Sequence, residues 1–297
     1  MAEIIFIGLS LASILLLVAL GLAITYGAMG VINMAHGELV MLGAYTAVLA
    51  IRYLDVPFVL CMPLAFLVSG TIGYATERLL VRHLYGRLID TLLATWGLSY
   101  ILIQLVRVDF GLAFLGINVP GLGPGLQNVP IPAYLTRSIL IGGFHFQTYR
   151  SFIILVALLL LLLTWWLIFR TSYGMQLRAV SANRNTAACC GVNDRRVNAW
   201  TFAYGSGLAG VAGVLLSGLQ TVDPDMGTHL VIDGFLVVVV GGVGSILGAI
   251  ASSAVLGEIN GLVALWWNDT VARAAVFALV IAIIIVRPRG LFALRGR

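Results

Sequence analysis

The sequence predicts an all-α integral membrane protein, a polytopic helical bundle of about eight to ten transmembrane segments. Three observations lead to this prediction. The composition is 61% hydrophobic and only 10% charged, with a mean hydropathy of +1.05. Several apolar runs approach the ~20 residues that a helix needs to cross ~30 Å of hydrocarbon. The arginines gather in a few short segments between those runs.

The apolar runs define the expected spans in chain order. The candidates are Ile4–Tyr26, Glu38–Ile51, Phe58–Thr76, Thr91–Val106, Ser151–Phe169, Ala199–Leu219, Gly234–Val243 leading into Ile246–Leu265, and Val271–Val286. The first run follows Met1, Ala2 and Glu3, which offer neither a basic region nor a small-residue cleavage site. We therefore expect a retained span there rather than a signal peptide.

Two glycine-rich breaks interrupt the apolar pattern, at Gly27–Gly37 and at Gly241–Ser245. A short apolar segment broken by glycines is typical of a discontinuous or re-entrant helix, which is tolerated only where it is buried in protein or lines a cavity. The stretch Glu38–Tyr45 resembles Gly244–Ile250, so an internal repeat with facing breaks is one interpretation. Chance similarity is the other, because Gly-Ala pairs are common in packed membrane helices.

The arginine distribution predicts which loops are cytoplasmic. Twelve of the 17 basic residues lie in Glu77–Asp90, in Arg170–Val197 and in the C-terminal Arg287–Arg297, and cytoplasmic loops show such an excess. The same pattern explains the net charge of +5, so we expect no nucleic-acid partner. Because the number of crossings between two inside segments is even, residues 107–150, rich in Gly and Pro, are predicted to form an external loop.

Missing residue types exclude several activities. The chain has no lysine, so it lacks the lysine of a P-loop ATPase, and any ATP that drives it is hydrolysed on another chain. Neither HExxH nor GxSxG occurs, and we expect no catalytic residue and no cofactor on this chain. Cys61 lies in an apolar run, and Cys189 and Cys190 adjoin in a loop on the reducing side, so we expect no disulfide and no metal site.

Polar residues near or inside the apolar runs are candidates for a substrate path. Charged side chains cost about 2.5 to 3.5 kcal/mol at the centre of a membrane helix and usually face the bundle interior or a cavity. The candidates are Asn33, His36, Glu38, Thr95, Trp96, Ser99 and Glu258. A structural role is the alternative, in which these groups tie down a broken helix or hold helices together by hydrogen bonds. Thr95, Trp96 and Ser99 suit a small, neutral, hydrogen-bonding solute.

The polar island Arg170–Val197 lies between two long apolar runs and holds five arginines. Helix connections are usually short, so an island of this length suggests a docking site for a soluble partner. Tyr173–Val180 and Asn183–Cys190 are each predicted to form a short helix, with Asn183 as an N-cap and Gly191 just after the C-terminus. A solvated surface loop is the alternative.

Four separated motifs resemble the branched-chain amino acid family of ABC transporter permeases. They are Ile32–Glu38 with Met41–Tyr45, Gly174–Val180 with Asn183, Ala187-Ala188 and Gly191-Val192, Val237–Ser245 with Gly248, and Arg287–Phe292. The motifs occur in order over nearly the whole chain. Within this family the chain most resembles the urea ABC transporter permease subunit, in stretches that include Tyr85–Arg87, Asp90–Gly97, Gly205–Gly207 and Phe292–Arg297.

The resemblance implies a single transmembrane permease domain over residues 1–297, in a bacterial inner membrane. Its implied function is to translocate urea or a related small amide, with branched-chain amino acids as the alternative. A passive channel or a secondary transporter is the alternative of another class. The implied partners are a homologous second permease, two ATP-binding cassette ATPase subunits that hold ATP and Mg, a periplasmic solute-binding protein and membrane lipid.

The resemblance also implies a role for each aqueous segment. The external loop 107–150 would help to receive the binding protein, and the polar island would couple this chain to the ATPases. The coupling residues implied by the family signature are Gly174, Leu177, Arg178, Asn183, Arg184, Ala187, Ala188 and Gly191.

Overall fold

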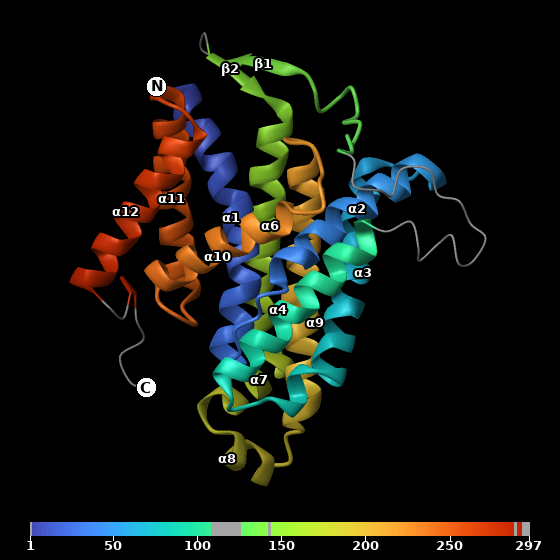
Figure 1. Cartoon of the computed structure of the whole chain (residues 1–297), viewed down its shortest axis with the longest axis vertical. Helices are drawn as coiled ribbons and strands as arrows, with labels where there is room; N and C mark the ends of the chain where they lie inside the picture. Colours follow the sequence, from blue (N-terminus) through green and yellow to red (C-terminus); the bar gives the residue numbers. More distant parts are fainter. Residues whose placement is uncertain (1, 108–125, 142–143, 288–289, 293–297) are drawn as a thin grey trace. The chain divides into compact units, whose positions relative to one another are not determined.

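The computed structural model describes residues 2–107, 126–141, 144–287 and 290–292, and Figure 1 traces their elements along the chain. The chain divides into two compact units, each assembled from segments far apart in the sequence. The first unit holds Met1–Ala28, Ile131–Val192 and Asp233–Arg297, and the second holds Met29–Pro130 and Asn193–Ile232. The single permease domain stays a prediction.

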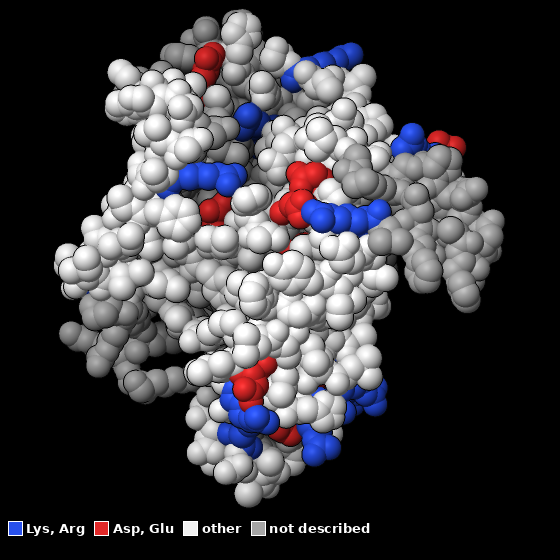
Figure 2. All heavy atoms as spheres, viewed as in Figure 1, with Lys and Arg blue, Asp and Glu red and all other residues white. Residues whose placement is uncertain are grey.

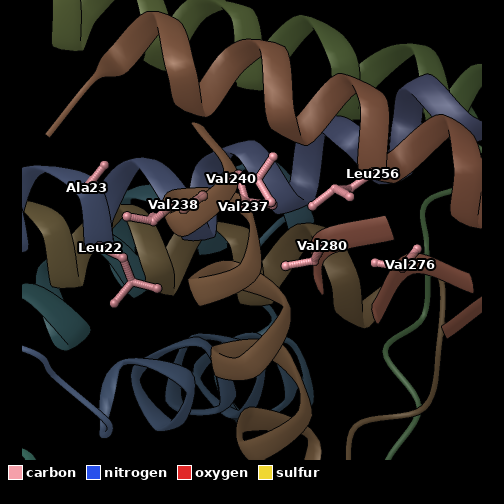
Figure 3. Close-up of a cluster of buried hydrophobic side chains, with 9 residues drawn as sticks. Leu22, Ala23, Val237, Val238, Val240, Leu256, Val276 and Val280 are labelled. Atoms are coloured by element: carbon pink, nitrogen blue, oxygen red, sulfur yellow. The ribbon is translucent and has the colours of Figure 1, made fainter. Parts of the chain in front are cut away.

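The first unit has its apolar core between four helices. Its elements are α1 (Ala2–Met29), β1 (Ser138–Ile141), β2 (Phe144–Gln147), α6 (Thr148–Arg170), α7 (Ser172–Ala182), α8 (Arg184–Cys189), the last turns of α10 (Met226–Gly241), α11 (Ile246–Trp266) and α12 (Asp269–Val286). Figure 3 shows the core, in which Leu22 of α1, Val237 of α10, Leu256 of α11 and Val280 of α12 converge.

The second unit is held together by close helix contacts at glycines. Its elements are α2 (His36–Leu54), α3 (Phe58–Leu79), η1 (Val81–His83), α4 (Leu88–Arg107), α9 (Asp194–Ser217) and the first turns of α10. α9 packs against both α2 and α3. A Cβ added to Gly43 of α2 would lie 2.5 Å from the Cα of Gly210 of α9, and one added to Gly213 would overlap the carbonyl oxygen of Val40. Small residues commonly permit such approaches between membrane helices.

The prediction of a polytopic all-α membrane bundle is confirmed. The described residues include seven helices long and apolar enough to cross a membrane. These are Ile5–Met29, His36–Leu54, Phe58–His83, Leu88–Arg107, Thr148–Arg170, Asp194–Ser217 and Ile246–Trp266. Two shorter apolar helices, Met226–Gly241 and Thr270–Val286, correspond to the predicted broken segment and the predicted last span. The predicted total of eight to ten segments therefore requires that at least one short helix also crosses.

Both predicted breaks are present, but the first covers only residues 30–35, because Gly27 still belongs to α1 and Gly37 already belongs to α2. The first separates α1 from α2, with a φ of 65° at Gly30, and the second separates α10 from α11, with φ of 95° at Gly242 and 76° at Gly244. These left-handed backbone conformations favour glycine, because it has no Cβ. In the first unit, Gly27 lies against the second break, since a Cβ at Gly27 would lie 2.6 Å from the Cα of Gly244. The internal repeat stays a prediction.

The predicted external loop contains a β-hairpin that the sequence analysis did not anticipate. β1 and β2 pair antiparallel, with Ser138 opposite Gln147. The hairpin rests on the start of α1: the backbone N–H of His145 donates to Glu3 Oε1 at 2.7 Å, and the rings of Phe6 and Phe146 meet edge to face with centroids 5.0 Å apart. Residues 108–125, which include part of the Gly-Pro run, lie outside the described residues.

Candidate functional site: a polar cavity in the second unit

A cavity of about 320 Å³ lies in the second unit. The break before α2 with its first turn, the middle of α4, and the start of α10 with the residue before it supply its walls. The lining residues are Met34, Glu38, Trp96, Ser99, Tyr100, Ile103, Asp225, Thr228, His229 and Val231. A small number of polar groups among aromatic and aliphatic side chains is typical of small-molecule sites, whose volumes run from ~300 to ~1,000 Å³.

Glu38 is a fully buried acidic residue in the wall of this cavity, with 0% of its surface exposed. Its Oε1 accepts one hydrogen bond from the Ser99 hydroxyl of α4 at 3.0 Å and another from the Thr228 hydroxyl of α10 at 3.2 Å. Its Oε2 has no hydrogen-bond partner among the described residues. One carboxylate oxygen is therefore held by two other helices, while the second retains the capacity to accept a donor.

Two facing glycines let the start of α10 reach Glu38. A Cβ added to Gly227 would lie 2.6 Å from the carbonyl oxygen of Gly37 and would overlap Glu38 Oε2. A Cβ added to Gly37 would overlap the carbonyl oxygen of Gly227. Any larger residue at either position would push α10 away from α2, so the close approach of the two backbones requires glycine at both.

Asn33 and Thr95, both predicted as path residues, support the break before α2 and are not among the lining residues. Asn33 Oδ1 accepts a hydrogen bond from the N–H of Ala35 at 3.1 Å. The Thr95 hydroxyl accepts one from the N–H of Met34 at 3.0 Å and donates to the carbonyl of Thr91 at 2.8 Å. Both contacts agree with the structural alternative, in which polar groups tie down the broken helix.

His36 and Glu258 are likewise not among the lining residues. His36 is fully buried at the first residue of α2, with 0% of its surface exposed. Glu258 belongs to α11 in the first unit, where it packs on α1: a Cβ added to Gly8 would lie 2.6 Å from Glu258 Oε2. The structure thus brings Glu38, Trp96 and Ser99 together in one lining, and the roles of the other candidates in a path stay predictions.

An aromatic pair and an ion pair border the cavity. The rings of Trp96 and Tyr100 meet edge to face with centroids 5.7 Å apart, and both side chains are about half exposed. Arg107, at the end of α4, binds both carboxylate oxygens of Asp225 with its Nη2, at 2.7 and 2.5 Å. The ion pair joins α4 to the residues before α10, and the positive charge of Arg107 balances the negative charge of Asp225.

Sequence reasoning missed the contribution of the α10 region to this site. Asp225, Thr228 and His229 were not among the predicted path residues. Their positions next to an apolar run carry a weak signal, since polar residues at helix starts are common as caps. The close contact of Gly37 with Gly227 lets the start of α10 approach Glu38, and no local pattern in the sequence predicts that contact.

The polar island forms the two helices that were predicted. Thr171 caps α7 by accepting a hydrogen bond from the N–H of Gly174 at 3.1 Å, and Asn183 caps α8 by accepting one from the N–H of Thr186 at 3.0 Å. α8 ends at Cys189, and Gly191 follows with a φ of 81°. In Figure 1, α7 and α8 follow one another at the lower end of α6. The predicted caps of α8 are confirmed.

Several predicted coupling residues anchor α7 to the end of α6. The Arg178 guanidinium donates a hydrogen bond to the carbonyl of Ile168 and lies over the ring of Phe169, 5.6 Å from its centroid. A Cβ at Gly174 would overlap that same Ile168 carbonyl oxygen, and Leu177 is only 5% exposed. These three residues therefore hold the island in place through contacts within the chain.

The exposed surface of α8 and its flanks consists of small and polar residues. The exposed positions on α8 and its flanks are Asn183, Asn185, Thr186, Ala188, Cys189, Cys190 and Gly191, whereas Ala187 is buried and Arg184 is partly buried. Figure 2 shows that charged side chains form separate groups on a largely uncharged surface in the face it presents. The coupling role of the island stays a prediction.

Long apolar helices and a polar cavity within one of the units define the class as a multi-pass helical membrane transport protein. The family model described as "Branched-chain amino acid transport system / permease component" matches residues 4–287, and the chain belongs to this family. The family description is that of a component of a transport system, which agrees with the prediction that this chain is a permease subunit and not an enzyme. The seven candidate spans among the described residues, together with this family, agree with the predicted multi-pass location in a bacterial inner membrane.

The chain is similar along almost its whole length to curated relatives. It is 31% identical to BraD, a high-affinity branched-chain amino acid transport system permease protein of Pseudomonas aeruginosa, over 96% of this chain and 93% of the relative. It is 29% identical to LivH of Escherichia coli over 96% of this chain and 93% of the relative. It is 27% identical to a probable LivH of Methanocaldococcus jannaschii over 93% of this chain and 85% of the relative. No solved structure matches the chain.

Proposed function

We propose that this chain is the membrane-spanning permease subunit of an ATP-driven importer for branched-chain amino acids. This proposal rests on the family match over residues 4–287 together with the similarity to BraD and LivH over 96% of the chain. Similarity of this extent covers the membrane helices, the cavity and the polar island together. The named transport role of these relatives is therefore supported for the whole chain rather than for a fragment.

The chemistry of the cavity supports the same substrate class. An amino acid with a branched apolar side chain needs hydrogen-bonding groups for its polar end and an apolar surface for the rest. Glu38, Ser99 and Thr228 supply the first, and Met34 with Ile103 supplies part of the second. We propose that substrate passes this cavity on its way through the permease.

Urea or a related small amide, the substrate that the sequence analysis favoured, receives less support. The family description and the relatives named above concern branched-chain amino acids. Urea carries no apolar group, so the aliphatic part of the lining would find no matching group on it. The branched-chain alternative of the sequence analysis is therefore our main proposal, and urea becomes the competing outcome of the test.

The proposed assembly contains a second homologous permease, two ATPase subunits and a periplasmic solute-binding protein. The absence of lysine from this chain supports a separate ATPase, because a P-loop requires one. We propose that α7 and α8 form the ATPase contact. Two capped helices, anchored to the end of α6 through Arg178, form a rigid projection that can transmit movement to the membrane helices.

Reconstitution of this chain with its partners in liposomes tests the proposal. We expect ATP-dependent uptake of labelled leucine that requires the binding protein and stops when the ATPase subunits bind ATP but cannot hydrolyse it. Labelled urea, supplied in parallel at the same concentration, should not accumulate. Uptake of urea without leucine would reject the branched-chain proposal. Uptake by this chain alone, without ATP, would instead identify a passive channel or a secondary transporter.

A further inference from the structure

We propose that Glu38 recognises the ammonium group of the transported substrate inside the permease, and that the aliphatic part of the lining receives its branched side chain. This inference rests on the proposed function and adds the recognition chemistry to it. The ligand class is a primary ammonium group carried on a short, branched alkyl chain. The permease itself would then select substrates, in addition to the binding protein that delivers them.

The Glu38 carboxylate has one oxygen held by hydrogen bonds and one without a partner among the described residues. The side chain is fully buried, and its Oε1 is fixed by the hydroxyls of Ser99 and Thr228 at 3.0 and 3.2 Å. Its Oε2 has no hydrogen-bond partner among the described residues. This oxygen lies against Gly227 at the start of α10. A buried acceptor without a donor is costly, so a ligand that displaces the start of α10 and brings an N–H to this oxygen gains a charge-assisted hydrogen bond.

The two acidic residues in the cavity lining differ in whether a positive charge balances them. Asp225 is the second acidic residue in the lining, and Arg107 binds both of its carboxylate oxygens. Glu38 has no such ion pair among the described residues. Among the described residues, the lining contains neither arginine nor lysine, and its basic side chain is that of His229. A cation therefore fits this cavity, whereas a ligand whose only charge is a carboxylate would meet Glu38 without an arginine or lysine to balance it.

Aromatic and aliphatic residues share the cavity lining with Glu38. Trp96 and Tyr100 present half-exposed rings in the same lining, and the faces of such rings attract an ammonium group. Met34, Ile103 and Val231 supply aliphatic surface in that lining. A cavity of about 320 Å³ with this division suits a ligand with one charged end and one branched apolar end.

Binding to the transporter in lipid nanodiscs, without the binding protein, tests the inference. The probes are leucine, 3-methylbutylamine, which keeps only the ammonium end, and 4-methylpentanoate, which keeps only the carboxylate end. We expect the first two to bind and the third not to bind. Replacing Glu38→Gln should weaken binding of leucine and of 3-methylbutylamine by about tenfold or more, because it removes the charge from the hydrogen bond.

Glu77→Gln is the matched control, because Glu77 is equally buried and also has one oxygen without a partner. Glu77 Oε1 accepts a hydrogen bond from the Tyr85 hydroxyl at 2.6 Å, and the residue lies outside the cavity lining. This variant should bind the amine as the parent chain does. Loss of thermal stability in Glu38→Gln with unchanged binding constants would show a structural role for Glu38 and overturn the inference.

A second variant keeps the inference testable if Glu38→Gln does not fold. Val231→Phe would reduce the space for the alkyl chain without removing Glu38, so binding of 3-methylbutylamine should fall at least tenfold relative to that of ethylamine. An unchanged ratio, or equal binding of 4-methylpentanoate and 3-methylbutylamine to the parent chain, would reject the recognition scheme. ATP-dependent leucine uptake in that case would leave the proposed function intact, whereas failure of leucine uptake would reject the function itself.

Discussion

The cavity and the polar island differ in how the chain builds them. The cavity joins Glu38, Ser99 and Thr228, which come from α2, α4 and α10 and are separated by up to 190 residues. The island is made of neighbours: Thr171 caps α7, Asn183 caps α8, and Arg178 binds a carbonyl only ten residues earlier. A change in helix packing should therefore disturb the cavity and leave the island folded, whereas loss of a cap should do the reverse.

The largest effect is expected at the glycine contact between α2 and α9. In Gly43→Ala the new Cβ would lie 2.5 Å from the Cα of Gly210, and neither backbone can yield without separating α2 from α9. We expect destabilisation of about 1–3 kcal/mol or more, measured as a lower melting temperature and a lower yield in detergent. Gly97→Ala is the control, because that position of α4 faces open space and should tolerate the change. Equal stability of both variants would contradict the close packing.

The next effect concerns the anchor of the island. Arg178→Ala removes the hydrogen bond to Ile168 and the contact with the Phe169 ring, and we expect α7 to detach from α6 at a cost of about 1.5–3 kcal/mol. Faster hydrogen exchange across α7 and a lower ratio of uptake to ATP hydrolysis would report it. Arg195→Ala, at an exposed arginine, should change neither. Normal coupling in Arg178→Ala would argue against the island as the ATPase contact.

A smaller effect is expected at the cap of α8. Asn183→Ala removes the side-chain acceptor for the Thr186 N–H, which typically costs about 1 kcal/mol of helix stability. Hydrogen exchange should increase over residues 184–189, while Asn183→Ser should retain most of the protection. Binding of 3-methylbutylamine should not change in either variant. A change in that binding would show that the island and the cavity are energetically coupled. It would contradict the expectation that loss of a cap leaves the cavity undisturbed.

The smallest effect is expected for the ion pair at the cavity border. Arg107 and Asp225 are 37% and 56% exposed, so removing the pair by Arg107→Ala should cost about 0.2–1 kcal/mol at low salt and almost nothing at high salt. Melting curves at the two salt concentrations measure this difference. The exchange of both residues, Arg107→Asp with Asp225→Arg, should restore part of the stability. A loss that persists at high salt would show a packing role instead.

The sequence predicted the local features of this protein well, because they depend on neighbouring residues. The spans follow from apolar runs of suitable length, the breaks from glycines that adopt positive φ, and the island helices from the Asn183 cap and the glycine after α8. The hairpin at Ser138–Gln147 was missed, since its strands are short and its contacts run to Glu3 and Phe6, about 140 residues earlier at the N-terminal end of the chain.

The candidate site was predicted only in part. Glu38, Trp96 and Ser99 were chosen as polar or interfacial residue types within apolar runs, and all three line the cavity. Asn33 and Thr95 were chosen for the same reason and instead hold the break before α2. Residue type alone does not distinguish a group that faces a cavity from one that satisfies backbone hydrogen bonds, because both uses favour the same side chains.

The sequence by itself determined that this chain is a multi-pass helical membrane protein of the permease family, with a capped polar island and no lysine for a P-loop. Only the tertiary structure decided which polar groups meet. Apolar length and capping act over a few residues, so they can be read along the chain. The contact of Gly37 with Gly227, which brings Thr228 to Glu38, depends on how distant helices pack, and that packing is absent from any local pattern.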